Sequence, residues 1–164
     1  MTNSPTPPAR GHSILRLMST GLLSGIISAL IAASTLLALS DAQYFGSAAG
    51  SAAKNYADDL PTALLAAFLW FLPVGILVFP PAAKFLGAAS SAGNLRLLKF
   101  VALAAILWCL LAEVIYLVLS PLAPAPPGVQ RDDLISAALS GVLFAIVYDL
   151  LLRRRDYLLN RKPR

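Results

Sequence analysis

Glu113 is the ionisable side chain whose surroundings in the sequence could support chemistry. It stands in an apolar stretch that covers about residues 97–119, and no other charged residue follows Lys99 there. A charge near the centre of a membrane-spanning helix costs about 2.5–3.5 kcal/mol, so such residues mark ion pathways, partner contacts or buried hydrogen bonds. Glu113 is therefore the first candidate for a functional residue.

Three other polar side chains share the expected helix face of Glu113. Cys109 precedes it by four residues, and Tyr116 and Ser120 follow it by three and seven, a spacing that places all four on one face. We expect this polar seam to face the interior of a helix bundle. Three roles are open for Glu113: an uncharged carboxyl that is hydrogen-bonded to another helix, proton or cation transfer, and contact with a partner subunit.

Asp149 also stands in an apolar stretch, but its neighbours indicate a simpler role. Arg153 follows it by four residues, and Arg154 and Arg155 come next. An acid and an arginine at this spacing meet on the surface of a helix, and arginine stems can reach from the membrane edge into water. We therefore interpret Asp149 and Arg153 as an interfacial ion pair.

The sequence contains no recognisable catalytic motif. Cys109 is the only cysteine, which excludes an internal disulfide, a C-x-x-C redox pair and a cysteine-built metal site, and His12 is the only histidine. H-E-x-x-H, G-x-S-x-G and phosphate-binding glycine loops are absent from the sequence. We predict no catalytic residue, no metal and no cofactor, and no nucleic-acid motif accompanies the net charge of +5.

Long apolar runs must position these residues. Of the 164 residues, 58% are hydrophobic and 13% are charged, a balance that soluble domains do not show. About 20 apolar residues cross the hydrocarbon core of a bilayer. We predict an all-α membrane protein, a four-transmembrane-helix bundle with spans at about 15–39, 60–79, 97–119 and 134–152. The transmembrane domain, 14–155, would lie between a disordered tail, 1–13, and a basic tail, 156–164.

Prolines set several of the expected span limits. We expect Asp59 to cap the second span, Pro73 to kink it, and Pro80 with Pro81 to end it. A cleaved signal peptide is an alternative interpretation of the first run, because residues 40–42 resemble a cleavage site. The run is longer than the apolar region of such signals, which favours a retained helix.

Lys and Arg are distributed unevenly between the two sides of the expected bundle. In short flanking segments these residues are retained on the cytoplasmic side of a membrane. Eleven of the thirteen fall on the side of the two chain ends, and only Lys54 and Arg131 fall on the other side. We therefore expect both ends in the cytoplasm, and we expect the bacterial inner membrane as the location.

Small residues recur every four positions in the first and fourth spans. They allow helix backbones to approach closely in lipid, so we expect them to pack inside the bundle. They are also common in membrane helices that use them for no contact, and this alternative stays open. The residues are Gly21, Gly25 and Ala29 in the first span and Ala137, Gly141 and Ala145 in the fourth.

These observations favour a function without catalysis. Small-residue helix faces and short loops are typical of a protein that assembles with others in the membrane. We interpret the chain as an accessory or structural subunit of a larger membrane complex, in contact with membrane lipids and with other membrane subunits or itself. The alternative is a small oligomeric transporter or channel that uses Glu113 for proton or cation coupling.

Overall fold

All regular elements that the structure describes are helices. The computed structural model describes residues 13–44, 49–91, 93–119 and 131–160, and it contains no β-strand in these residues. Ser120, the proline-rich stretch after it and most of both tails lie outside the described residues. In chain order the elements are α1 (Ile14–Tyr44), α2 (Ala49–Pro73), the π-helical segment η1 (Val74–Val78), α3 (Phe79–Phe85), α4 (Gly93–Leu119) and α5 (Arg131–Asn160).

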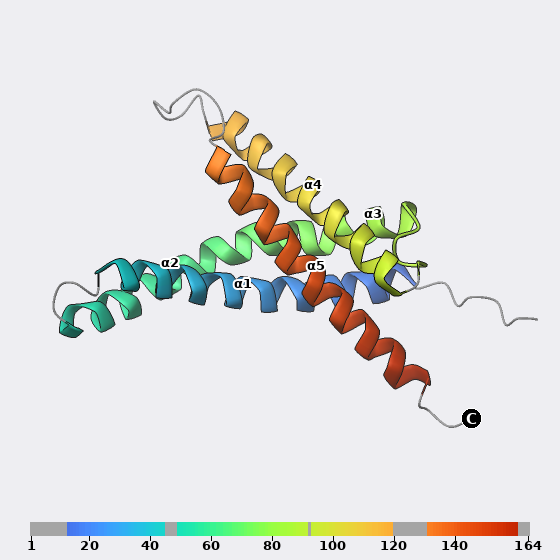
Figure 1. Cartoon of the computed structure of the whole chain (residues 1–164), viewed down its shortest axis with the longest axis horizontal. Coiled ribbons are helices and arrows are strands. Elements are labelled where there is room, and N and C mark those ends of the chain that lie inside the picture. Colours follow the sequence, from blue (N-terminus) through green and yellow to red (C-terminus); the bar gives the residue numbers. More distant parts are fainter. Residues whose placement is uncertain (1–12, 45–48, 92, 120–130, 161–164) are drawn as a thin grey trace, which may run out of the picture.

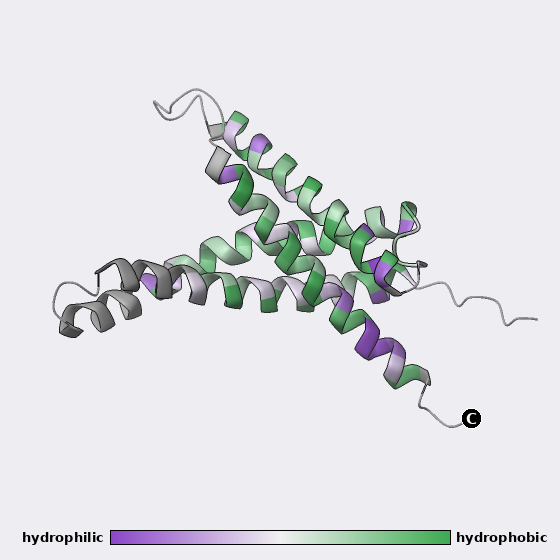
Figure 2. Cartoon of the chain, viewed as in Figure 1, coloured by the Kyte–Doolittle hydropathy of each residue, from purple (hydrophilic) through white to green (hydrophobic). Residues whose placement is uncertain are grey.

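Among the described residues, four helical stretches are long and apolar enough to cross a membrane. Figure 2 shows hydrophobic residues along most of each described helix and hydrophilic residues mainly toward the helix ends. The prediction of an all-helical chain with four spans is confirmed, and the chain has the composition and helices of an integral membrane protein. The stretches are Ile14–Thr35, Asp59–Phe85, Gly93–Val118 and Asp133–Leu159.

The helices form two antiparallel hairpins that cross each other (Figure 1). α1 packs along α2, and α4 packs along α5. The hairpins meet where α1 contacts α5 and where α3 contacts α4. Away from this crossing the α4–α5 hairpin diverges from α1 and α2 (Figure 1).

The two ends of the bundle differ in charge. Arg16 in the first turn of α1 forms an ion pair with Asp156 near the end of α5, so the start of α1 and the end of α5 lie on the same side of the bundle. We call this side the basic end. Asp59 and Asp133, both exposed, are the first residues of the second and fourth membrane-crossing stretches, on the opposite side, which we call the acidic end.

The helix that contains the second span begins well before the predicted start of that span. α2 starts at Ala49, and Pro61 therefore lies inside the helix rather than in its first turn. Asp59 is a residue of the helix interior, so the expectation that it caps the span is wrong. The ten residues of α2 before Asp59 extend the helix past the apolar run.

A π-helical segment lets the second span continue past its prolines. η1 follows Pro73 directly, and the N–H of Phe79 bonds to the carbonyl oxygen of Val74, five residues earlier. This register change starts a new helical segment, in whose first turn Pro80 and Pro81 need no N–H donor. The expectation that these prolines end the span is wrong for this reason, and the irregularity expected at Pro73 takes the form of η1.

The helices that contain the first and fourth spans also extend beyond the predicted limits of those spans. α1 passes through residues 40–42 and ends at Tyr44. α5 passes through Arg153–Arg155 and ends at Asn160, so the first residues of the segment 156–164 are helical rather than part of a tail. Helix formation thus extends beyond the apolar residues that gave the predicted limits.

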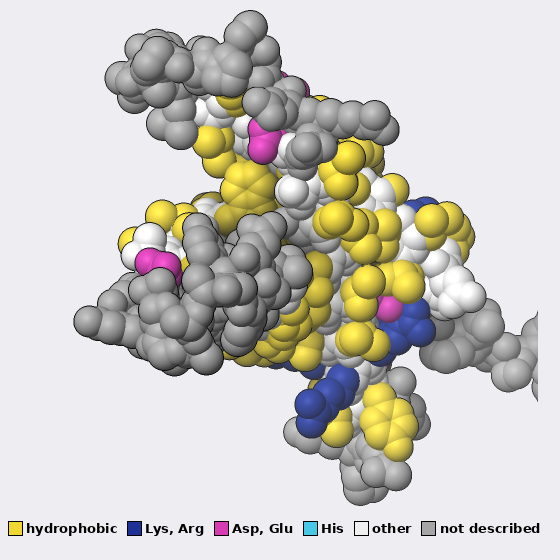
Figure 3. All heavy atoms as spheres, turned by 60° about the vertical axis from the view of Figure 1, so that its left-hand side comes forward, with side chains coloured by type: hydrophobic (Ala, Val, Ile, Leu, Met, Phe, Trp, Pro, Cys, Tyr) yellow, Lys and Arg dark blue, Asp and Glu magenta, His cyan; other side chains and the backbone are white. Residues whose placement is uncertain are grey.

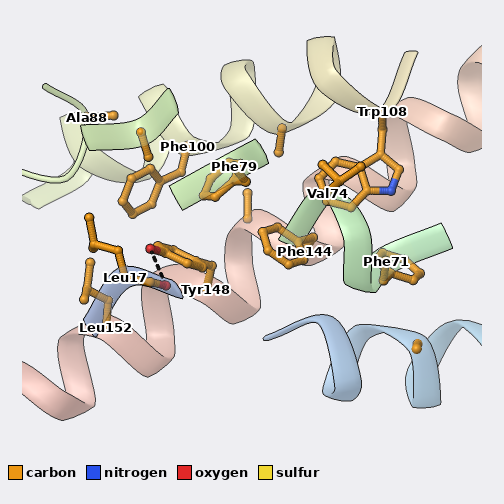
Figure 4. Close-up of a cluster of buried hydrophobic side chains, with 14 of the residues drawn as sticks. Leu17, Phe71, Val74, Phe79, Ala88, Phe100, Trp108, Phe144, Tyr148 and Leu152 are labelled. Carbon is orange, nitrogen blue, oxygen red and sulfur yellow. Dashed lines mark hydrogen bonds between the residues drawn. The ribbon is translucent and has the colours of Figure 1, made fainter. Parts of the chain in front are cut away.

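Six aromatic side chains form the centre of the bundle, where the hairpins cross (Figure 4). Each is at most 1% exposed. The ring of Phe79 in α3 lies 5.0–5.6 Å from rings of α4 and α5, in the edge-to-face geometry that aromatic pairs prefer. This cluster fixes the two hairpins against each other. Its members are Phe71, Phe79, Phe100, Trp108, Phe144 and Tyr148.

Candidate functional site

Glu113 lies on the outside of α4. Its side chain is exposed, as are those of Leu110, Val114 and Leu117 around it, at 55%, 55% and 69%. Within the described residues the Glu113 carboxyl has no hydrogen-bond or ion-pair partner. The expectation that it faces the bundle interior is wrong, because the neighbouring helices cover other sides of α4. We call these four residues the Glu113 face.

The packing of α4 on α5 shows how far Glu113 lies from the ends of the bundle. The two helices are antiparallel, and the Cys109 thiol donates a hydrogen bond to the carbonyl oxygen of Leu134 at 3.7 Å. Continuing this register by one turn brings Glu113 level with the first turn of α5, which begins at Arg131. Glu113 therefore lies close to the acidic end of the described bundle.

The structure separates the members of the predicted polar seam. Cys109 and Tyr116 are half-buried, and Cys109 faces α5. Glu113 lies on the neighbouring, uncovered side of α4, and Ser120 lies outside the described residues. The described part of the seam therefore does not form one interior polar surface.

The small-residue face of α1 packs against the second span. A Cβ atom added at Gly21 would collide with the carbonyl oxygen of Gly75 in η1, and one added at Gly25 would lie 3.0 Å from Cδ2 of Leu72. Ala29 is fully buried on the same side. Gly21 and Gly75 thus allow the two backbones to touch, which larger residues would prevent.

The small-residue face of α5 packs against α4. A Cβ atom added at Gly141 would lie 2.7 Å from the carbonyl carbon and oxygen of Ala104 and 2.9 Å from the nitrogen of Ala105. Ala137 and Ala145 are buried on the same helix, at 2% and 0% exposure. Each small-residue face therefore serves its own hairpin.

Asp149 is the centre of a buried ion-pair group at the basic end. One carboxyl oxygen accepts a hydrogen bond from Nε of Arg96 at 2.8 Å, and the other accepts from Nε of Arg153 at 2.6 Å. The side chains of Asp149 and Arg96 are only 3% and 11% exposed, whereas that of Arg153 is 43% exposed. The sequence interpretation included Arg153 but missed Arg96, which lies 53 residues away and is the more buried of the two arginine partners.

A second ion-pair group ties α1 to the same place. Asp156 accepts from Arg16 and, at 3.4 Å, from Arg96. Arg155 donates to the hydroxyls of Ser19 and Thr20 at 2.6 and 2.8 Å. Charged groups of α1, α4 and α5 are thereby joined at one end of the bundle.

Positive charge is in excess in this arrangement. Three arginines pair with two aspartates, Asp149 and Asp156, and a fourth, Arg155, donates to the carbonyl oxygen of Arg16 beside them. Figure 3 shows Lys and Arg side chains gathered together with an acidic side chain among them, while much of the remaining visible described surface is apolar. The group can hold three helices together and attract anions, but it contains no nucleophile and base in contact. The described residues also hold no group of three His, Cys, Asp or Glu side chains that could bind a metal.

Comparison with known proteins gives no relative: no family model, curated protein or solved structure matches the chain. The residues and their geometry therefore carry the functional argument alone.

Proposed function

We propose that this chain is a non-enzymatic accessory or structural subunit of a larger membrane assembly, and that a partner helix packs on the Glu113 face. The outward position of the Glu113 carboxyl, without a partner in the described residues, is the observation that carries the proposal. A polar group exposed to lipid is unfavourable, and a hydrogen-bond donor from a partner would offset that cost.

The residues around Glu113 suit a helical partner. Leu110, Glu113, Val114 and Leu117 have the i, i+3, i+4, i+7 spacing of a single helix face, and all are exposed. Apolar contact alone gives little specificity in lipid, because lipid chains are equally apolar. A carboxyl within this apolar surface would supply a specific hydrogen bond to a matching donor on the partner.

Photocrosslinking in the native membrane tests the proposal. A benzoylphenylalanine at Leu117 should crosslink to one defined membrane protein. The same residue at Leu69 of α2, which is 67% exposed compared with 69% for Leu117, is the matched control and should give lipid adducts. Lipid adducts from both positions would refute the proposal.

Substitution of Glu113 gives a second readout. Glu113→Gln keeps the hydrogen-bonding capacity of the side chain, so copurification of the crosslinked partner in mild detergent should persist. Glu113→Leu removes that capacity, and copurification should fall while the isolated chain folds as before. Equal partner retention by both variants would show that the carboxyl does not contribute to the contact.

The second candidate function is an oligomeric transporter or channel. Because Glu113 lies outside the bundle, an ion path that uses it would run between copies of the chain. A Leu117 crosslink to a second copy, together with loss of proton-dependent flux in Glu113→Gln vesicles, would support this candidate. A crosslink to a different protein would support the accessory subunit.

We also propose that the basic end faces the cytoplasm, in a bacterial inner membrane. The excess of Lys and Arg at that end supports this orientation. A reporter that is active only in the cytoplasm should be active after Arg164 or near Ser91, and inactive near Gly50 or Gly128. Activity near Gly50 would refute the orientation.

A further inference from the structure

A pocket of about 280 Å³ opens on the lipid-facing side of α4, in the half of the helix nearest the basic end. It lies between α4 and the turn that follows α3, and Lys99 is its only charged lining residue. Its volume is at the lower end of the range for ligand pockets, about 300–1,000 Å³. The lining residues are Leu86, Ala88, Lys99, Ala102, Leu103 and Ile106.

The turn after α3 leaves this space because it is built from small residues. Gly87, at φ 65°, ends α3: its N–H bonds to the carbonyl oxygen of Lys84, and the N–H of Ala88 bonds to that of Ala83. This is the Schellman arrangement, which requires the left-handed backbone that glycine adopts readily. With only a methyl group on Ala88 and Ala102, the gap between the turn and α4 stays open.

The Lys99 ammonium is held at the edge of the pocket. It donates to the Ser91 hydroxyl at 2.8 Å, and that hydroxyl donates to the carbonyl oxygen of Gly87 at 3.1 Å. The lysine stem thus follows the pocket wall while its charge points to the turn at the basic end, as lysines near membrane surfaces do. Only one of the three ammonium hydrogens is used by this contact.

We propose that this pocket binds a phospholipid with an anionic headgroup from the leaflet at the basic end. Its phosphate contacts the Lys99 ammonium, and the upper part of one acyl chain fills the space between Leu86, Ala102 and Ile106. Two of these walls, Leu86 and Ile106, are 59% and 60% exposed, so a chain can enter directly from the bilayer. The pocket lining has no acidic side chain, which favours an anionic over a zwitterionic headgroup.

The site is separate from the Glu113 face. Glu113 lies seven residues beyond Ile106, about 10 Å further along α4, so a partner helix at Glu113 and a lipid at Lys99 can bind together. The lipid proposal does not depend on the proposed function.

Native mass spectrometry of delipidated protein with added lipid tests the site. Dioleoylphosphatidylglycerol should bind at one site more tightly than dioleoylphosphatidylcholine. Lys99→Gln should weaken phosphatidylglycerol binding about five-fold, as expected for one lysine near a membrane surface. Lys84→Gln, which removes an exposed lysine of α3 outside the pocket, is the matched control and should bind as the parent does.

A pocket-filling variant separates a built site from general charge attraction. Ala102→Phe places a ring in the pocket without changing any charge, and it should weaken phosphatidylglycerol binding while the protein stays monodisperse in detergent. Inorganic phosphate should not compete with the lipid at millimolar concentration. Equal effects of Lys99→Gln and Lys84→Gln, unchanged binding by Ala102→Phe, or displacement by phosphate would each overturn the proposal.

Discussion

Loss of the Asp149 charge should destabilise the protein more than loss of Arg153, the half-exposed arginine that pairs with it. Breaking a buried ion pair by removing one member costs about 3–5 kcal/mol, because the other charge stays buried without compensation. Asp149 and Arg96 are 3% and 11% exposed and belong to this class. Arg96 keeps Asp156 as a partner at 3.4 Å, so the expected cost of Asp149→Asn is at the lower limit, about 3 kcal/mol.

The two arginine partners of Asp149 should behave differently. Arg153 is 43% exposed, and pairs with such exposure contribute about 0.2–1 kcal/mol. In double-mutant cycles of unfolding in mixed detergent micelles, coupling of Asp149 to Arg96 should exceed 1 kcal/mol, and coupling to Arg153 should be about 0.5 kcal/mol or less. Arg154→Gln, which changes an exposed arginine with no hydrogen bond or ion pair among the described residues, is the control and should stay within about 0.5 kcal/mol of the parent.

Replacing both members of the buried pair provides the decisive comparison. Arg96→Met combined with Asp149→Leu removes both charges and leaves apolar side chains in their place, so it should recover much of the stability lost in either single variant. A double variant that is less stable than both single variants, or equal couplings to the two arginines, would refute this assignment of the buried pair.

Four further substitutions test the packing of the bundle, three by unfolding in the same micelles and one by hydrogen exchange. Gly141→Ala should cost about 1–3 kcal/mol because its methyl group meets the backbone of Ala104. Gly25→Ala should be close to neutral, because its one tight contact is with the flexible tip of Leu72 and the backbone atoms near it are at ordinary contact distance. Equal stability of the two variants would contradict the close backbone contact at Gly141. Tyr148→Phe removes the hydrogen bond from the tyrosine hydroxyl to a carbonyl oxygen of α1. It should cost about 0.6 kcal/mol of stability, the mean for hydrogen bonds in a membrane. A loss above about 2 kcal/mol would point to a larger role. Pro73→Ala should leave the fold intact but slow hydrogen exchange across η1, because it restores a backbone N–H donor. Unchanged exchange would show that the proline does not maintain the π-helical segment.

The four spans could be predicted because their signal is local. A run of about 20 apolar residues is sufficient to cross a bilayer whatever its neighbours are, and each of the four runs lies in a helix. The limits were less predictable because helices continue beyond the apolar residues. The end of the second span also depends on η1, where a backbone N–H bonds to the carbonyl oxygen five residues earlier instead of four. Hydropathy carries no information about such a change of hydrogen-bond partner.

The charged residues of the basic end were predictable only in part. Asp149 and Arg153 are one helical turn apart, so their pairing follows from the sequence of a single helix. Arg96 lies in another helix, and its contact with Asp149 depends on the packing of α4 against α5. The available signal was weak: both residues were expected on the same side of the membrane, but eleven of the thirteen Lys and Arg residues share that side.

The position of Glu113 shows where helical periodicity stops being informative. The spacing of Cys109, Glu113 and Tyr116 places all three within one broad face of α4. α5 covers Cys109, whose thiol reaches Leu134, but Glu113 lies at the uncovered edge of that face. Which edge is covered depends on the side from which the next helix approaches, and that is set elsewhere, by the close contact of Gly141 with Ala104. A carboxyl one turn beyond a half-buried thiol can thus face outward, away from the helix that covers the thiol.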